Sequence, residues 1–263
     1  FTVWFSQNSI SDLIEYSKLG GITSFESFSF KSALAVVVAV TAAEIFSQGY
    51  WQRTFSAENA KSLKSASVYA GLGCFITIFL LGIAGAVGAG KGIESPTLSF
   101  IQQLELSIPM ALLLLLLCTL LVASSVDTLE NAISSTISLD LVKKGISEAR
   151  VITAGIVIFS ILCSIYVSNI FNVFLVADLF AVCLVFPTFY KLKNNSSGSY
   201  LLVPFFISLS SVYSYRFFFI DVDINPGGIF IPTDAYGLAD LNTFLVGLVS
   251  SMLITLAYNK IIK

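Results

Sequence analysis

A run of apolar residues from Met110 to Val122, in which Thr119 is the only polar side chain, most constrains what this chain can fold into. Similar runs recur along the 263 residues, of which 56% are apolar and 11% are charged, against roughly 45–50% and 25% in soluble proteins. The mean hydropathy is +0.88. A water-soluble fold cannot bury that much apolar surface. The sequence therefore predicts an integral membrane protein whose main solvent is the bilayer.

Seven segments are apolar enough to cross a bilayer, given that a spanning helix needs about 20 such residues. They lie at roughly 31–50, 67–90, 108–127, 150–169, 171–190, 200–220 and 241–259. A closed β-barrel would instead need segments of about ten residues of alternating hydropathy, which unbroken apolar runs do not provide. We therefore expect an all-α, polytopic membrane protein with about seven transmembrane helices.

Lysine and arginine residues are distributed unevenly between alternate loops. If the seven spans cross the membrane in turn, consecutive loops lie on opposite sides, and ten of the 14 Lys and Arg residues fall on one side. Because positively charged loops stay inside, this side is expected in the cytoplasm of a plasma membrane or bacterial inner membrane. The N-terminus would then lie outside and the C-terminus inside.

The chain starts at Phe1 with no signal-peptide pattern, so we expect a fragment of a longer protein.

The composition also narrows the classes of function. There is no histidine, the commonest general base and metal ligand, so hydrolytic and redox chemistry are disfavoured and no enzyme activity or cofactor is expected. A chain with these apolar spans is not a nucleic-acid binder. The segment from Gly85 to Lys91 matches the Gly-x4-Gly-Lys skeleton of a phosphate-binding loop, but Gly92 replaces the magnesium-binding Ser or Thr. We expect these glycines to permit close helix contact instead.

Carboxylates inside membrane spans are costly and usually face a cavity. Four such residues are Glu44, Asp127, Glu130 and Asp178. Glu44 belongs to a polar cluster with Thr41 and Gln48, which we expect to bind the substrate. A satisfied hydrogen bond between helices is the alternative for Glu44. Asp178 could bond a helix end or line a pathway, and the sequence leaves both open.

A second polar cluster follows the apolar run of the third span. Helical spacing places four residues on one face, namely Ser124, Thr128, Asn131 and Ser135. The hydroxyl groups of Ser124, Thr128 and Ser135, with backbone carbonyls, are ligands that suit sodium. The alternative is that the span leaves the membrane here, because Ser124 lies about 22 Å along the helix from Pro109, past the midplane of a ~30 Å core.

Two stretches resemble the sodium/solute symporter family, which transports sugars, proline, pantothenate and urea. Residues Phe46–Asn59 resemble the family's helix end with a Gln, a Gln-Arg pair, a small-residue turn and a basic cytoplasmic loop. Residues Ser124–Ala132, followed by Ser134–Thr136 and Leu139–Leu141, are similar to its Ser-Ser/Thr motif, which ends in an Asn, small residues and a cytoplasmic Asp. With hydropathy and topology, the resemblance covers most of the chain.

The resemblance implies a transport core of two inverted five-helix repeats, of which this chain holds the second. Residues 1–30 would be an extracellular loop, 31–190 the second repeat, and 191–263 a cytoplasmic loop with two peripheral helices. The N-terminal half of the same transporter would complete the sodium site. Carried over from the family, Ser124 and Ser125 would supply hydroxyl ligands and Leu121 a carbonyl ligand for sodium.

Departures from the family pattern bear on the solute. Ala43 stands where sugar carriers place a gating Tyr, and the second span lacks the intramembrane Lys of some sugar carriers, so a hexose is disfavoured. The run Gly49–Gln52 resembles the urea-transporting branch. Asp127 and Glu130 make this stretch more acidic than the family motif, and they form a candidate proton or second-cation site.

We expect a sodium-coupled symporter that imports a small polar, urea-like solute. The alternatives are a proton-coupled carrier using Glu44 or Asp127, and a non-transporting membrane sensor or structural module.

Overall fold

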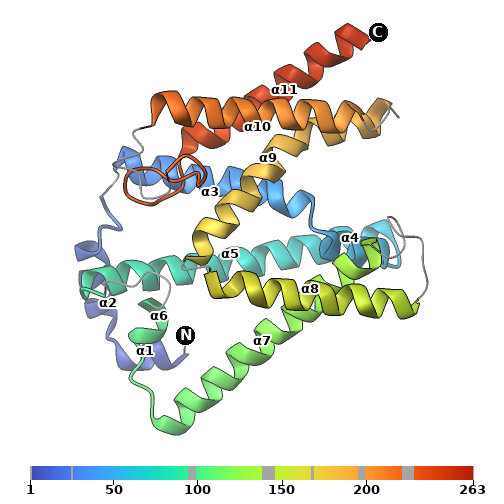
Figure 1. Ribbon diagram of the computed structural model, residues 1–263. Helices are drawn as coiled ribbons and strands as arrows, with labels where there is room; N and C mark the ends of the chain where they lie inside the picture. The colour runs from blue at the N-terminus through green and yellow to red at the C-terminus, as the bar shows by residue number, and fades with distance from the viewer. Residues whose placement is uncertain are drawn as a thin grey trace. The chain divides into compact units, whose positions relative to one another are not determined.

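A computed structural model describes residues 2–24, 26–93, 99–137, 146–166, 169–194, 199–220 and 228–262. These residues are almost entirely helical, with one isolated antiparallel bridge between Thr233 and Ala239 (Figure 1). The helices are α1 (Thr2–Gln7), α2 (Ile10–Leu19), α3 (Ser27–Ile45), α4 (Gln48–Phe55), α5 (Ala60–Gly90), α6 (Ser99–Gln102), α7 (Ile108–Ser135), α8 (Ile146–Tyr166), α9 (Ile170–Asn194), α10 (Ser199–Phe219) and α11 (Leu241–Ile262). The predicted all-α fold is confirmed.

Six of these helices are long and apolar enough to cross a membrane. They are α3, α5, α7, α9, α10 and α11. The chain is therefore an integral, multi-pass membrane protein. The seventh expected span, 150–169, falls on α8, whose apolar stretch among the described residues is Arg150–Leu162. α8 itself runs over 21 residues, from Ile146 to Tyr166, so the seventh span stays a prediction.

Helices group into two compact units, each described here by itself. The first consists of residues 1–26 and 51–153, and the second of residues 27–50 and 154–263. Of the three boundaries between them, one precedes α3 and the other two fall within α4 and α8. This grouping reflects which helices pack together and not how repeats are related. The expected division at residues 30 and 190 therefore stays a prediction.

In the first unit, α2 and α6 pack against the end of α5. Trp4 is fully buried there, and its indole Nε1 donates to Oε1 of Gln103 at 3.1 Å. The Gln103 amide nitrogen in turn donates to the carbonyl oxygens of Ala84 and Ser99, both at 2.8 Å. A buried side-chain amide is stable when its hydrogen-bonding groups are satisfied in this way.

Glycines at the end of α5 allow its neighbours to approach closely. A Cβ atom at Gly90 would overlap the carbonyl oxygen of Tyr16 in α2, and one at Gly20 would overlap the carbonyl oxygen of Ala86 in α5. A Cβ at Gly88 would overlap the hydroxyl of Ser99. The expectation that these glycines serve close helix contact is thus confirmed for Gly88 and Gly90 and is wrong for Gly85, where no atom lies within 4 Å of a built Cβ.

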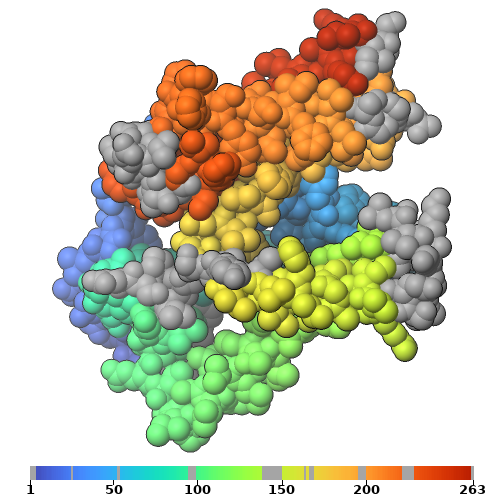
Figure 2. Space-filling view, viewed as in Figure 1, coloured from blue at the N-terminus to red at the C-terminus, as the bar shows by residue number. Residues whose placement is uncertain are grey.

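The second unit is built around α9, which packs against α3, α10 and α11. Figure 2 shows the side chains of α10 (orange) lying against those of α9 (gold). Small side chains permit the close contact of α3 with this core, namely Ala35, Ala39 and Ala42. Between α10 and α11, the buried Ser208 hydroxyl donates to the carbonyl oxygen of Gly247 at 3.0 Å. Small residues and interhelical hydrogen bonds of this kind are typical of membrane helix packing.

Candidate solute and cation sites

The predicted sodium ligands lie on consecutive turns of α7. The hydroxyl of Ser125 donates to the carbonyl oxygen of Leu121 at 3.0 Å, so two of the three expected ligand atoms are adjacent. The carbonyl oxygen of Ser124 accepts a hydrogen bond from the Thr128 hydroxyl at 2.9 Å. A hydroxyl one turn after a carbonyl is a common arrangement in apolar helices, because it satisfies the hydroxyl within its own helix.

All three predicted ligands are exposed on α7. Leu121 is 70% exposed, and the apolar part of α7 has no buried residue. Among the described residues, the hydrogen bonds of Ser124 and Ser125 join them to other residues of α7. Sodium requires about five or six oxygens. The assignment of these residues to sodium stays a prediction.

Asp127 and Glu130, the candidate proton or second-cation residues, follow on the next turns of α7. Oδ1 of Asp127 accepts a hydrogen bond from the Asn131 amide at 3.2 Å. The Asp127 side chain is exposed and that of Glu130 is half-buried. One turn further on, the Thr153 hydroxyl in α8 donates to the hydroxyl of Ser134 at 2.6 Å, which ties the polar end of α7 to α8.

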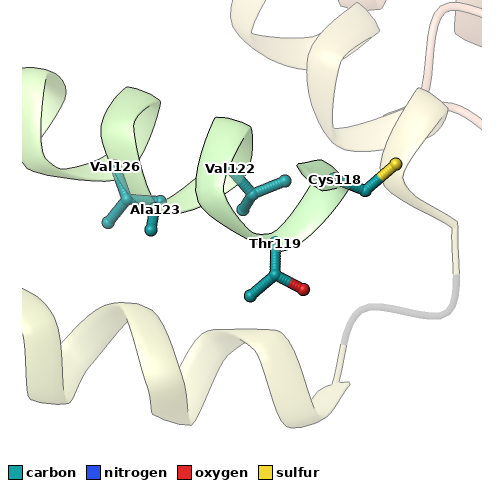
Figure 3. A pocket seen from close by; sticks show the side chains of 5 residues that line it. All are labelled: Cys118, Thr119, Val122, Ala123 and Val126. Atoms are coloured by element: carbon teal, nitrogen blue, oxygen red, sulfur yellow. The ribbon is translucent and has the colours of Figure 1, made fainter. Parts of the chain in front are cut away.

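An open hollow runs along a different stripe of α7 (Figure 3). Its volume is about 420 Å³, and its lining is Cys118, Thr119, Val122, Ala123 and Val126. Side chains at these spacings share one face of a helix. None of the predicted sodium ligands belongs to this lining, so the hollow is an apolar surface distinct from the proposed ion ligands.

The predicted solute-binding residues do not lie on one continuous helix. α3 ends at Ile45 and α4 begins at Gln48, so the expected span through residue 50 is wrong at its end. The backbone forms a tighter, 3₁₀-type turn at the end of α3, where the amide of Ser47 donates to the carbonyl of Glu44, three residues back. Thr41 and Glu44 are exposed on α3, while Gln48 is half-buried at the start of α4. Their binding role stays a prediction.

Asp178 lies in the apolar core of the second unit. Its side chain is only 6% exposed, on the α9 face that also carries Leu175, Leu179 and Val182. Within the described part of the chain, no hydrogen bond or ion pair engages the Asp178 side chain. The expected bond to a helix end is thus not found there.

Arg216 is a structural residue that the sequence analysis did not single out. It is completely buried at the end of α10. Its guanidinium donates to the carbonyl oxygens of Gly228 at 2.6 Å, Ile229 at 2.8 Å and Thr233 at 3.3 Å. It also donates to the Thr243 hydroxyl at 3.0 Å. The signal that could have revealed this role is a cation placed among the aromatic residues of a span.

The carboxylate of Asp240 completes this arrangement. It lies 3.9 Å from the Arg216 guanidinium and accepts hydrogen bonds from the backbone amides of Asn242 and Thr243. Asp240 therefore caps the N-terminus of α11, where unpaired amides and the helix dipole favour a negative charge. Arg216 and Asp240 together fix residues 228–240 between α10 and α11.

Comparison with known proteins finds sequence similarity to a transporter. It is similar to the spermidine transporter DUR31 of Candida albicans, with 26% identity over 196 residues, covering 69% of this chain and 37% of the relative. The chain thus spans just over a third of the length of the curated relative that it matches. No protein-family model and no solved structure matches the sequence. At this identity the symporter family is not established, and the resemblance to it stays a prediction.

Proposed function

We propose that this chain is part of a secondary active transporter that couples sodium entry to the import of a small polar organic solute. The observation that carries the proposal is the similarity, over 196 residues, between a multi-pass helical membrane chain and a spermidine transporter. The adjacency of the Ser125 hydroxyl and the Leu121 carbonyl on α7 supports sodium as the coupling ion.

The solute that we propose is small, polar and nitrogen-rich. The name of the relative points to an amine, and the Gly49–Gln52 run resembles the urea-transporting branch. Ala43 and the absence of a lysine between residues 67 and 90 argue against a hexose. In this proposal Thr41, Glu44 and Gln48 line the solute cavity.

Coupling needs no covalent chemistry, so the protein acts as a carrier and not as an enzyme. Sodium bound by Leu121, Ser124 and Ser125 favours the outward-open state and thereby raises the affinity for the solute. Sodium is the coupling ion, and no other cofactor is required. The proposed partners are membrane lipid, sodium, the solute and the N-terminal half of the same transporter, with the N-terminus of this chain outside and its C-terminus in the cytoplasm.

Removing the two serine hydroxyls should weaken sodium coupling strongly. We expect Ser124→Ala/Ser125→Ala to raise the sodium concentration for half-maximal uptake by about 10–100-fold, which corresponds to a loss of about 0.7–1.4 kcal/mol for each ligand. Uptake of labelled spermidine, urea, small amino acids and glucose by the full-length protein in proteoliposomes, with and without a sodium gradient, measures this effect. Glucose uptake is expected to be absent.

A matched control is available in α10, where Ser210 and Ser211 also donate to carbonyls of their own helix. Ser210→Ala/Ser211→Ala should leave the sodium dependence unchanged. If uptake depends on a pH gradient and not on sodium, the coupling ion is a proton carried by Glu44 or Asp127. If no solute is taken up under any gradient, the sensor or structural module replaces the transporter.

A further inference from the structure

Three tyrosines from three helices meet at one end of the second unit. Tyr190 lies near the end of α9, Tyr200 near the start of α10 and Tyr258 near the end of α11. The rings of Tyr190 and Tyr200 are stacked with their centroids 6.3 Å apart, and the ring of Tyr258 meets that of Tyr200 edge-on at 5.4 Å. All three side chains are half-buried. These residues form a tyrosine cluster that joins the ends of the three helices.

The phenol hydroxyls of the tyrosine cluster are available to a partner outside the protein. Within the described ranges, no hydrogen bond engages them. Tyrosine hydroxyls that are partly withdrawn from water usually find a hydrogen-bond partner, and tyrosines gather where the apolar core of a bilayer meets its headgroups. Tyr258 follows Leu241, the first residue of α11, by 17 residues, or about 26 Å at 1.5 Å per residue. That length is close to the ~30 Å thickness of the core, so the cluster lies at the level of the headgroups.

The helix turns that carry the tyrosine cluster are positively charged. Lys191 and Lys193 lie in the last turn of α9 and Lys260 in that of α11, and no ion pair in the described part of the chain engages them. Among the described residues of α9, α10 and α11 the one carboxylate is Asp178, which precedes the α9 tyrosine by 12 residues, about 18 Å along the helix. Asp240 caps the opposite end of α11. A ligand attracted to these turns is therefore an anion.

An anionic phospholipid fits these side chains better than a free anion does. Its phosphate oxygens accept hydrogen bonds from phenol hydroxyls and from lysine ammonium groups. Exposed apolar side chains flank the cluster, namely Phe189 and Leu192 on α9 and Ile261 on α11. These side chains suit acyl chains next to the headgroup, whereas a free anion makes no use of them. The combination of positive, phenolic and apolar side chains thus indicates a lipid.

We propose that the tyrosine cluster, with Lys191, Lys193 and Lys260, binds the headgroup of an anionic phospholipid where α9, α10 and α11 meet the bilayer surface. The tyrosine hydroxyls donate to the phosphate, and the lysines supply the opposite charge. This inference goes beyond the proposed function, because the site holds a lipid and not the transported solute. In the expected orientation these helix ends face the cytoplasmic leaflet, in which anionic lipids are enriched. A bound headgroup joins the ends of three helices and so stabilises the folded state.

Lipid binding to the purified full-length protein in detergent micelles tests the site without requiring transport. We expect phosphatidylglycerol to raise the Tm of the wild type more than phosphatidylcholine with the same acyl chains does. Lys191→Gln/Lys193→Gln/Lys260→Gln should raise the Kd for phosphatidylglycerol by about 100-fold, at about fivefold for each lost charge. Native mass spectrometry, which resolves the lipid-bound protein from the free protein, measures the Kd.

The tyrosines are tested by a variant that keeps their rings. Tyr190→Phe/Tyr200→Phe/Tyr258→Phe retains the ring contacts and removes the three hydroxyls. We expect it to raise the Kd for phosphatidylglycerol by about tenfold, because hydrogen bonds to the charged phosphate are lost while the lysines remain.

A matched control for the lysines is available elsewhere in the chain. Lys61 and Lys64 on α5 and Arg150 on α8 are three exposed cations that are expected on the same side of the membrane and lie outside the tyrosine cluster. Lys61→Gln/Lys64→Gln/Arg150→Gln should leave the Kd for phosphatidylglycerol unchanged.

The outcomes separate this inference from the proposed function. Phosphatidylglycerol binding that the lysine and tyrosine variants weaken, in a protein that takes up no solute, upholds the site and rejects only the transport proposal. Equal losses in the lysine variant and its control overturn the site, because they show a general attraction of positive loops for anionic lipid. Equal binding of the two lipids by the wild type, an unchanged Kd in the tyrosine variant, or displacement of the lipid by inorganic phosphate also overturns it. If the tyrosine variant does not fold, the exposed lysines and their control decide.

Discussion

Replacing Arg216 with methionine should lower the free energy of unfolding by about 3–5 kcal/mol, the usual cost of breaking a buried ion pair by removing one partner. The variant leaves the carbonyl oxygens of Gly228, Ile229 and Thr233 without their donor in a buried place. Denaturant titration of the full-length protein in detergent micelles measures the loss. Faster proteolysis between residues 228 and 240 should accompany it, because Arg216 fixes that loop.

Two further variants identify the interactions responsible. Lys260→Met removes an exposed cation from the last turn of α11 and should change stability by less than about 0.5 kcal/mol. Asp240→Asn keeps a helix cap but removes the charge, and we expect it to cost less than Arg216→Met. If Asp240→Asn is as costly as Arg216→Met, the ion pair dominates and the carbonyl contacts contribute little.

The second large effect is expected at the contact between α2 and α5. Gly90→Ala places a Cβ atom against the carbonyl oxygen of Tyr16, and backbone atoms cannot turn aside as a side chain can. The two helices must separate, at a cost of about 1–3 kcal/mol. The same denaturant titration measures this loss. Gly20→Ala should be similarly costly, because its Cβ would meet the carbonyl oxygen of Ala86.

Gly85, one turn earlier in α5, provides the matched control. No atom lies within 4 Å of a Cβ built there, so Gly85→Ala meets no obstacle. Alanine is favoured over glycine in a helix interior by up to about 1 kcal/mol, and this variant should be neutral or stabilising. Equal losses for Gly85→Ala and Gly90→Ala would show that helix propensity, and not the contact with Tyr16, controls this region.

The membrane spans could be predicted because hydropathy is a local property of the sequence. An unbroken run such as Met110–Val122 identifies a spanning helix without knowledge of its neighbours. Gly88 and Gly90 at the end of α5 were also interpreted correctly as positions of close helix contact, whereas Gly85 has no such contact. The break between Ile45 and Gln48 was missed, because apolar residues continue to Phe46 and no proline marks the end of α3.

The candidate sites could be predicted only in part, because they depend on which helices meet. Sequence spacing placed Ser125 one turn after Leu121, and the structure has the corresponding hydrogen bond. Nothing in the sequence shows that α9 packs on α3, α10 and α11, so the burial of Asp178 could not be derived. The burial of Arg216 likewise depends on the path of residues 228–240, which local patterns do not determine.

The hydroxyl groups of Thr119, Ser125 and Thr128 find their hydrogen-bond acceptors within α7 itself. Thr119, Ser125 and Thr128 each donate to a carbonyl four residues earlier, so no polar hydrogen on them faces lipid unpaired. Rotation of a single side-chain torsion converts such a hydroxyl from an internally bonded group into an outward-facing oxygen ligand. The transport cycle that we propose requires α7 to move between an apolar and a hydrated environment, and these internally paired hydroxyls lower the free-energy cost of that change.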